Sequence, residues 1–182
     1  MKDFRYYADC FSSLHTAMKL GKPAPHKALL LLSVIDLVER GLIGDNHIFL
    51  SDILVKAFNA NAKKLYANSP IFKPEVTKPF FHMQHEPFWS LVASSHCIAT
   101  SLAAECTSKY GRSKPTYSVK GLREQFRYAE LDNELFELLK NEDARARLRV
   151  ILISTYLNNR IDLFIPIAAL PIYLSILSTL AC

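Results

Sequence analysis

Two short segments of this sequence combine cations with rigid or apolar groups, and both have the composition of an anion-binding site. The segment Lys78-Pro79-Phe80-Phe81-His82 places two basic side chains around a proline and two phenyl rings. The segment Pro25-His26-Lys27 stands at the start of a leucine-rich run that is expected to be a helix. A helix start offers unpaired backbone N–H groups and the positive end of the helix dipole, and both favour an anion.

Each segment also has a purely structural interpretation. Most helix starts are solvated, and for Pro25-His26-Lys27 taken alone that is the simpler interpretation. In the other segment, Phe80 and Phe81 can belong to the core while Lys78 lies in water. We expect at least one of the two phenylalanines to be buried.

The sequence contains no recognisable catalytic motif. A Gly-rich phosphate loop, an HExxH zinc motif and a GxSxG nucleophile elbow are all absent. His96 and Cys97 are neighbours in the sequence, but a cysteine nucleophile needs a base that the fold brings to it, so Cys97 is interpreted as a small core residue. We expect a protein without enzymatic activity or a cofactor.

The run His82-Met83-Gln84-His85 has the HxxH spacing that suits two metal ligands on a helix. Four prolines between residues 68 and 87 favour extended backbone instead, in which positions i and i+3 point to opposite faces. No cluster of cysteines or carboxylates completes a ligand set. We therefore predict no metal site, and a strand over residues 76–83 with Pro79 and Phe81 on the face opposite to Lys78, Phe80 and His82.

Length and composition favour one globular domain. The chain has 182 residues, of which 50% are hydrophobic and 21% charged, enough to bury a sizeable core. The formal net charge is +5, and the window 109–127 alone holds six basic residues and one acid. A surface for a polyanion would therefore be local. The four cysteines lack CxxC spacing and the N-terminus lacks the apolar run of a signal peptide, which favours a cytoplasmic protein.

Hydrophobic periodicity predicts the elements that would position these residues. Helices are expected over residues 3–19, 26–40, 52–61, 118–127, 132–140 and 142–158. Short strands are expected over 47–50, 76–83 and 88–92. The predicted fold class is mainly α with a small β element (α+β), in a single compact helical domain that carries short strands.

Residues 163–182 form an apolar tail without a charge, and twenty such residues are long enough to cross a bilayer. Pro166 and Pro171 interrupt a helix in its first half, and no charge flanks its end. Three interpretations stay open: a segment packed on the domain or a partner, a membrane segment, or a reading-frame artefact.

Four segments, in their order and spacing, resemble the sulfur-binding domain of phosphorothioate-dependent HNH restriction endonucleases, which are type IV, modification-dependent enzymes. The segments are PHKALLLLSVIDLVERGLI, SDILVKAF, KPFFHMQHEPFWSL and LDNELFELLKNEDARARLRVILISTYL, and the match spans about residues 1–158. The resemblance implies recognition of double-stranded DNA in which sulfur replaces a non-bridging phosphate oxygen. In that family a shallow apolar pocket takes the sulfur, and basic residues bind the neighbouring phosphates.

The resemblance also implies roles for particular residues. The family's His-basic pair falls on His26 and Lys27, and its pocket segment falls on residues 78–82. The pocket wall would comprise Lys78, Pro79, Phe81 and His82, and the loop that contacts DNA would contribute Lys109, Arg112, Ser113 and Lys114. Two departures stand out: the family often has Tyr at the position of Lys78 and Pro at the position of Ala28, and the first of these puts the shape of the pocket in doubt.

Family members continue into an HNH nuclease domain, which this sequence does not show. We therefore expect a DNA-recognition domain over residues 1–160 and a tail of unknown role over 161–182. The domain is expected to be either a stand-alone module or the targeting part of a restriction or defence system whose nuclease is a separate domain or chain, or was removed. No small-molecule substrate is expected. Two alternatives stay open: recognition of other modified or unmodified DNA by the same fold, and a helical protein-interaction or membrane-tethered protein.

Overall fold

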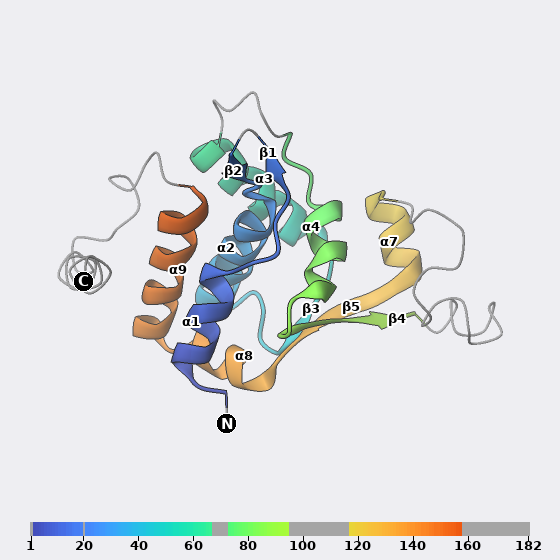
Figure 1. The fold of residues 1–182 in the computed structure, drawn as a ribbon. Helices are drawn as coiled ribbons and strands as arrows, with labels where there is room; N and C mark the ends of the chain where they lie inside the picture. The colour runs from blue at the N-terminus through green and yellow to red at the C-terminus, as the bar shows by residue number, and fades with distance from the viewer. Residues whose placement is uncertain (1, 20, 67–72, 95–116, 158–182) are drawn as a thin grey trace.

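The computed structural model describes residues 2–19, 21–66, 73–94 and 117–157, and these are mainly helical with a small β component, as predicted (Figure 1). In chain order the elements are α1 (Phe4–Ser12), β1 (Met18–Lys19), β2 (Lys22–Pro23), α2 (His26–Glu39), β3 (His47–Ile48), α3 (Asp52–Tyr66), α4 (Thr77–His82), the 3-10 turn η1 (Met83–His85), β4 (Trp89–Ala93), α7 (Val119–Gln125), β5 (Phe126–Leu131), α8 (Asn133–Lys140) and α9 (Glu142–Tyr156).

Helix α2 lies at the centre of the hydrophobic core. All of its residues are buried except His26, Asp36 and Glu39, so other elements must cover it on nearly every side. It packs against α3, α4, α8 and α9, and Figure 1 shows α1 and α9 on one side of it and α4 on the other. Gly41, with a φ of +67°, follows its C-terminal end, in agreement with the stop predicted from the sequence.

A three-stranded antiparallel sheet of order β3-β5-β4 lies beside the helices. Ile48 pairs with Ala129 in one ladder and Trp89 pairs with Leu131 in the other, and all four side chains are buried. The central strand β5 was not predicted. The expected helix from Ser118 to Arg127 ends at Gln125, where the chain passes directly into this strand.

The segment predicted as a strand over 76–83 is a helix, α4, followed by η1. Pro79 is the third residue of α4, where the backbone N–H would have no partner inside the helix, so proline costs no hydrogen bond there. The predicted alternation of faces is wrong for the same reason, and Phe80 and Phe81 are both buried. Helical backbone instead brings Lys78 and His82, four residues apart, to the same side.

Other predicted boundaries hold in part. Ser118 and Asn141 cap their helices, and their side chains accept hydrogen bonds from the backbone N–H groups of Gly121 and Ala144. Asp132 is the N-cap residue of α8, but its side chain makes no capping hydrogen bond; its carboxylate instead accepts hydrogen bonds from Lys2 Nζ at 2.6 Å and Tyr7 Oη at 3.0 Å. Helix α1 is shorter than predicted, and α3 is longer.

The apolar tail over 163–182 lies outside the residues that the structure describes. Among those it does describe, no helix has the length and apolar character needed to span a bilayer.

Candidate nucleic-acid interface

The two segments singled out in the sequence meet in the fold, although about fifty residues separate them. His26 is the first residue of α2, and α2 packs against α4, which carries the second segment. Burial lowers the pKa of His26, the nearby Lys78 lowers it further, and Glu75 opposes this change. His26, Lys78 and Glu75 are therefore electrostatic neighbours at the junction of the two helices.

Helix α4 combines an exposed cation, a buried proline and a half-buried imidazole. The Lys78 side chain is 53% exposed, Pro79 is buried and His82 is half-buried. Phe81 is buried behind them, and its ring packs edge-on against the rings of Tyr117 and His82 at centroid distances of 5.8 and 5.1 Å. Pro79 and Phe81 therefore lie beneath the face and are not exposed on it, in contrast to their predicted place in the pocket wall.

Tyr117 is a site residue that the sequence did not reveal. Its hydroxyl lies 3.1 Å from Nε2 of His82, and the two rings pack at a centroid distance of 5.6 Å. This contact fixes the orientation of the imidazole at the end of α4. Tyr117 lies in the basic window 109–127, but nothing in the sequence indicates its contact with His82, because the two residues are 35 positions apart.

The imidazole of His82 is held in its neutral form near pH 7. Burial is the largest cause that lowers its pKa, and the nearby side chains of His85, Lys27 and Lys78 act in the same direction. Because an ordinary histidine titrates near pH 6.5, a lowered pKa leaves this ring mostly uncharged at neutral pH.

Lys27 is placed differently from its neighbour His26. Its side chain is 7% exposed, and its ammonium pairs with the carboxylate of Glu86, which is 2% exposed. Glu86 also accepts a hydrogen bond from the backbone N–H of His15 at 3.0 Å. This arrangement does not favour the predicted contact of Lys27 with phosphate; the pair instead ties the first turn of α2 to the residue that follows η1.

The predicted loop residues Lys109, Arg112, Ser113 and Lys114 lie outside the described part of the chain. The rest of the basic window is partly neutralised by acids. Arg123 donates to Asp52 at 2.6 Å, and Lys120 lies 4.0 Å from Glu124. The charge of this window that can reach a ligand is therefore smaller than the sequence suggests.

The predicted orientation of His82 and His85 on opposite faces of a strand is also wrong. Because η1 continues the helical path, His82 and His85 do not face opposite sides; their rings stack at a centroid distance of 6.0 Å. Two imidazoles alone do not make a stable metal site. Within the described ranges, no group of three or more histidines, cysteines and acids is placed to hold a metal ion.

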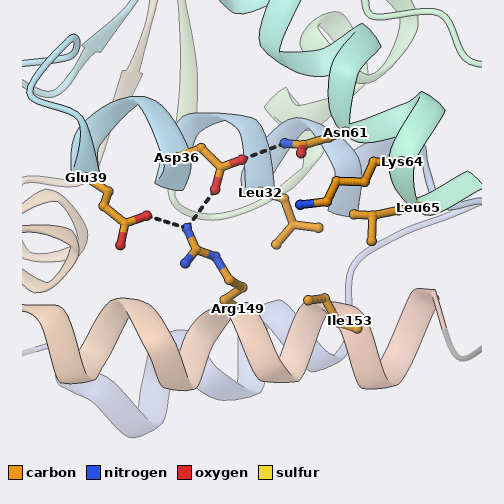
Figure 2. A pocket seen from close by; sticks show the side chains of 8 residues that line it. All are labelled: Leu32, Asp36, Glu39, Asn61, Lys64, Leu65, Arg149 and Ile153. Atoms are coloured by element: carbon orange, nitrogen blue, oxygen red, sulfur yellow. Dashed lines mark hydrogen bonds and ion pairs between the residues drawn. The ribbon is translucent and has the colours of Figure 1, made fainter. Parts of the chain in front are cut away.

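A separate pocket of about 210 Å³ lies between α2, α3 and α9 (Figure 2). Figure 2 shows Arg149 pointing from α9 toward Asp36 and Glu39 of α2, with contacts of 2.6 and 2.9 Å. Asn61 of α3 donates to Asp36 at 2.7 Å. These polar groups bind one another and connect three helices, so we assign them a structural role and not a ligand-binding one.

The recognition face, defined here as His26, Lys78, Pro79 and His82, therefore presents one exposed ammonium beside two half-buried titratable rings, with the buried ring of Pro79 beneath them. No protein-family model matches this chain, and no curated protein matches it either.

Proposed function

We propose that this protein binds double-stranded DNA and recognises a phosphorothioate in the DNA backbone at the recognition face. The observation that carries this proposal is the meeting of His26 at the start of α2 with Lys78, Pro79 and His82 on α4. A ligand at this place would meet C–H groups of the half-buried His26 and His82 rings, packed over the buried Pro79, and it would meet the Lys78 ammonium at the edge.

The chemistry of this face suits sulfur better than oxygen. Sulfur is larger and more polarisable than oxygen and is a poorer hydrogen-bond acceptor, so apolar C–H groups can replace its water at small cost. A phosphate oxygen pressed against the same atoms would lose hydrogen bonds to water, at a cost of roughly 1–3 kcal/mol for each unsatisfied group. Selection then comes from the penalty on oxygen as much as from any attraction to sulfur.

The same proposal gives a place to the other basic residues. Lys109, Arg112, Ser113 and Lys114 would contact neighbouring phosphates and base edges in a groove. The protein would act in the cytoplasm as the targeting part of a restriction or defence system, and a separate nuclease domain or chain would cut the DNA.

A binding series with one duplex tests the proposal. The duplex is prepared with a single sulfur in each stereochemical configuration and without sulfur, and binding is measured by fluorescence anisotropy. We expect tighter binding to one sulfur stereoisomer, by about tenfold or more if one unsatisfied oxygen acceptor is avoided. Equal affinity for all three duplexes contradicts the sulfur proposal, and no binding to any of them contradicts DNA binding.

Variants of the recognition face locate the effect. Pro79→Ala and His82→Ala are expected to remove most of the preference for sulfur while leaving affinity for the unmodified duplex nearly unchanged. Lys140→Ala is the matched control, because it removes an exposed charge at the end of α8, away from this face. If Pro79→Ala weakens binding to both duplexes equally, the pocket is not at this helix.

A further inference from the structure

The exposed lysine of the recognition face is paired with an acid. Nζ of Lys78 lies 3.0 Å from Oε2 of Glu75, and the two side chains are 53% and 41% exposed. The other oxygen of Glu75 accepts a hydrogen bond from Oγ1 of Thr77 at 3.1 Å, so the carboxylate is held in place from two sides. The hydrogen bond from Lys78 is the largest cause that lowers the pKa of Glu75, and the carboxylate is therefore ionised at neutral pH.

The pairing has little value for stability. Ion pairs between exposed side chains contribute at most about 1 kcal/mol and often nothing measurable. An anion beside a surface that must bind a polyanion also reduces affinity, because it repels phosphate and occupies a cation. On the proposed function, Glu75 would thus oppose nonspecific DNA binding while its ion pair adds little to the stability of the fold.

We propose that Glu75 is a specificity-determining residue of the recognition face, because its ion pair withholds the Lys78 ammonium from phosphate oxygen. This inference rests on the proposed function and adds the group that keeps ordinary DNA out. An ammonium is a compact, strongly hydrated charge that hydrogen-bonds oxygen well. If Lys78 were free, an oxygen at the face would gain a donor, and the penalty that distinguishes it from sulfur would be lost.

The buried pair of Lys27 and Glu86 follows the same pattern on the α2 side. Each lysine adjoining the imidazoles is thus matched with a glutamate, one pair exposed and one buried. Lys78 lowers the pKa of His26 and Glu75 raises it. The pKa of His82 is lowered by His85, Lys27 and Lys78, and its ring contacts Tyr117. Lys73 also lies near Glu75 and supplies a charge that attracts DNA of either kind.

The test is Glu75→Gln in the full chain, measured on the sulfur and unmodified duplexes. Glutamine has the same shape and can still accept from Thr77, so the fold should be retained. We expect affinity for the unmodified duplex to rise about tenfold, the scale of one charged hydrogen bond, while affinity for the sulfur duplex rises less. The salt dependence of binding to the unmodified duplex should steepen by about 0.9, the value for one added phosphate contact.

The chain offers a matched control in Glu137→Gln. Glu137 and Lys140 form another exposed pair three residues apart, at 2.6 Å on α8. This variant makes the same change of net charge, so it should leave the preference for sulfur unaltered. A double-mutant cycle adds a second check: in a Lys78→Met background, Glu75→Gln should have no further effect on the preference.

The outcomes separate this inference from the proposed function. If wild type prefers sulfur and Glu75→Gln keeps that preference unchanged, the role of Glu75 is wrong while the proposed function stands. The same holds if Glu137→Gln lowers the preference equally, because net charge alone then explains the effect. If wild type shows no preference for sulfur, the proposed function fails and this inference fails with it.

Discussion

At the scale of single residues, the recognition face depends on two imidazoles that resist protonation. Burial is the main cause that lowers the pKa of both His26 and His82, and nearby cations add to it. In the unfolded chain the same side chains titrate near pH 6.5. Below that pH the unfolded state therefore binds more protons than the folded state, and acid destabilises the fold through these residues.

This linkage predicts a pH-dependent loss of stability with a definite sign. The free energy of unfolding should be highest above about pH 6.5 and should fall as the pH is lowered from 7.5 to 5.5. His82→Gln, which keeps a polar partner for Tyr117 but cannot titrate, should reduce that fall. Urea unfolding at three pH values measures both proteins, and an equal fall in the two would show that His82 is not responsible.

Binding of a polyanion should raise the lowered pKa values of His26 and His82, so that these rings no longer favour the neutral form. DNA phosphates close to His26 and His82 would favour the charged imidazoles, so these side chains would bind protons on formation of the complex. The same side chains that make the free fold sensitive to acid would then strengthen DNA binding at low pH.

At the scale of elements, the sequence predicts helices better than it predicts the strands and short helices near the site. The run that forms α2 is apolar on nearly all sides, and its end at Gly41 is marked by a residue that tolerates a positive φ. By contrast, four prolines led us to predict extended backbone over 76–83. Proline breaks a helix interior but not a first turn, and only the position of the helix start distinguishes the two cases.

The candidate site was predicted only in part for a related reason. His26, Lys78, Pro79 and His82 could be selected from their own chemistry and from the order of the surrounding segments. Glu75, Glu86 and Tyr117 could not, because their importance comes from what they contact. Glu86 pairs with a lysine 59 residues away, and Tyr117 contacts an imidazole 35 residues away. A side chain's long-range partner is not encoded in its local spacing.

The N-cap of α9 allows the contribution of a side-chain cap to stability to be measured. Asn141 Oδ1 accepts from the backbone N–H of Ala144 at 3.0 Å, which satisfies one of the free donors of the first turn. Asn141→Ala should therefore lower the free energy of unfolding by about 1 kcal/mol. Asn133→Ala is the matched control, since this exposed asparagine is the first residue of α8 and not its N-cap. Equal losses in denaturant unfolding would mean that the cap contributes nothing specific.

At the scale of the whole molecule, the recognition face is an extension of the core. Phe80 and Phe81 of α4 belong to the same hydrophobic cluster as the leucines of α2. This packing fixes the backbone of the face. On the proposed function, less backbone ordering would then be needed when DNA binds, and the net charge of +5 would supply the general attraction to a polyanion.

This separation of roles predicts how salt affects binding. The attraction between basic residues and phosphates releases counterions, so log K should fall linearly with log salt at about −0.9 for each phosphate contacted. On the proposed function, sulfur would be selected by apolar contact, which releases no counterion. The sulfur and unmodified duplexes should therefore give parallel lines whose separation is the preference for sulfur. Lys114→Ala should lower both lines and make both slopes shallower by about 0.9. In the wild-type protein, a steeper slope for the sulfur duplex than for the unmodified duplex would show that charge, and not apolar contact, selects the ligand.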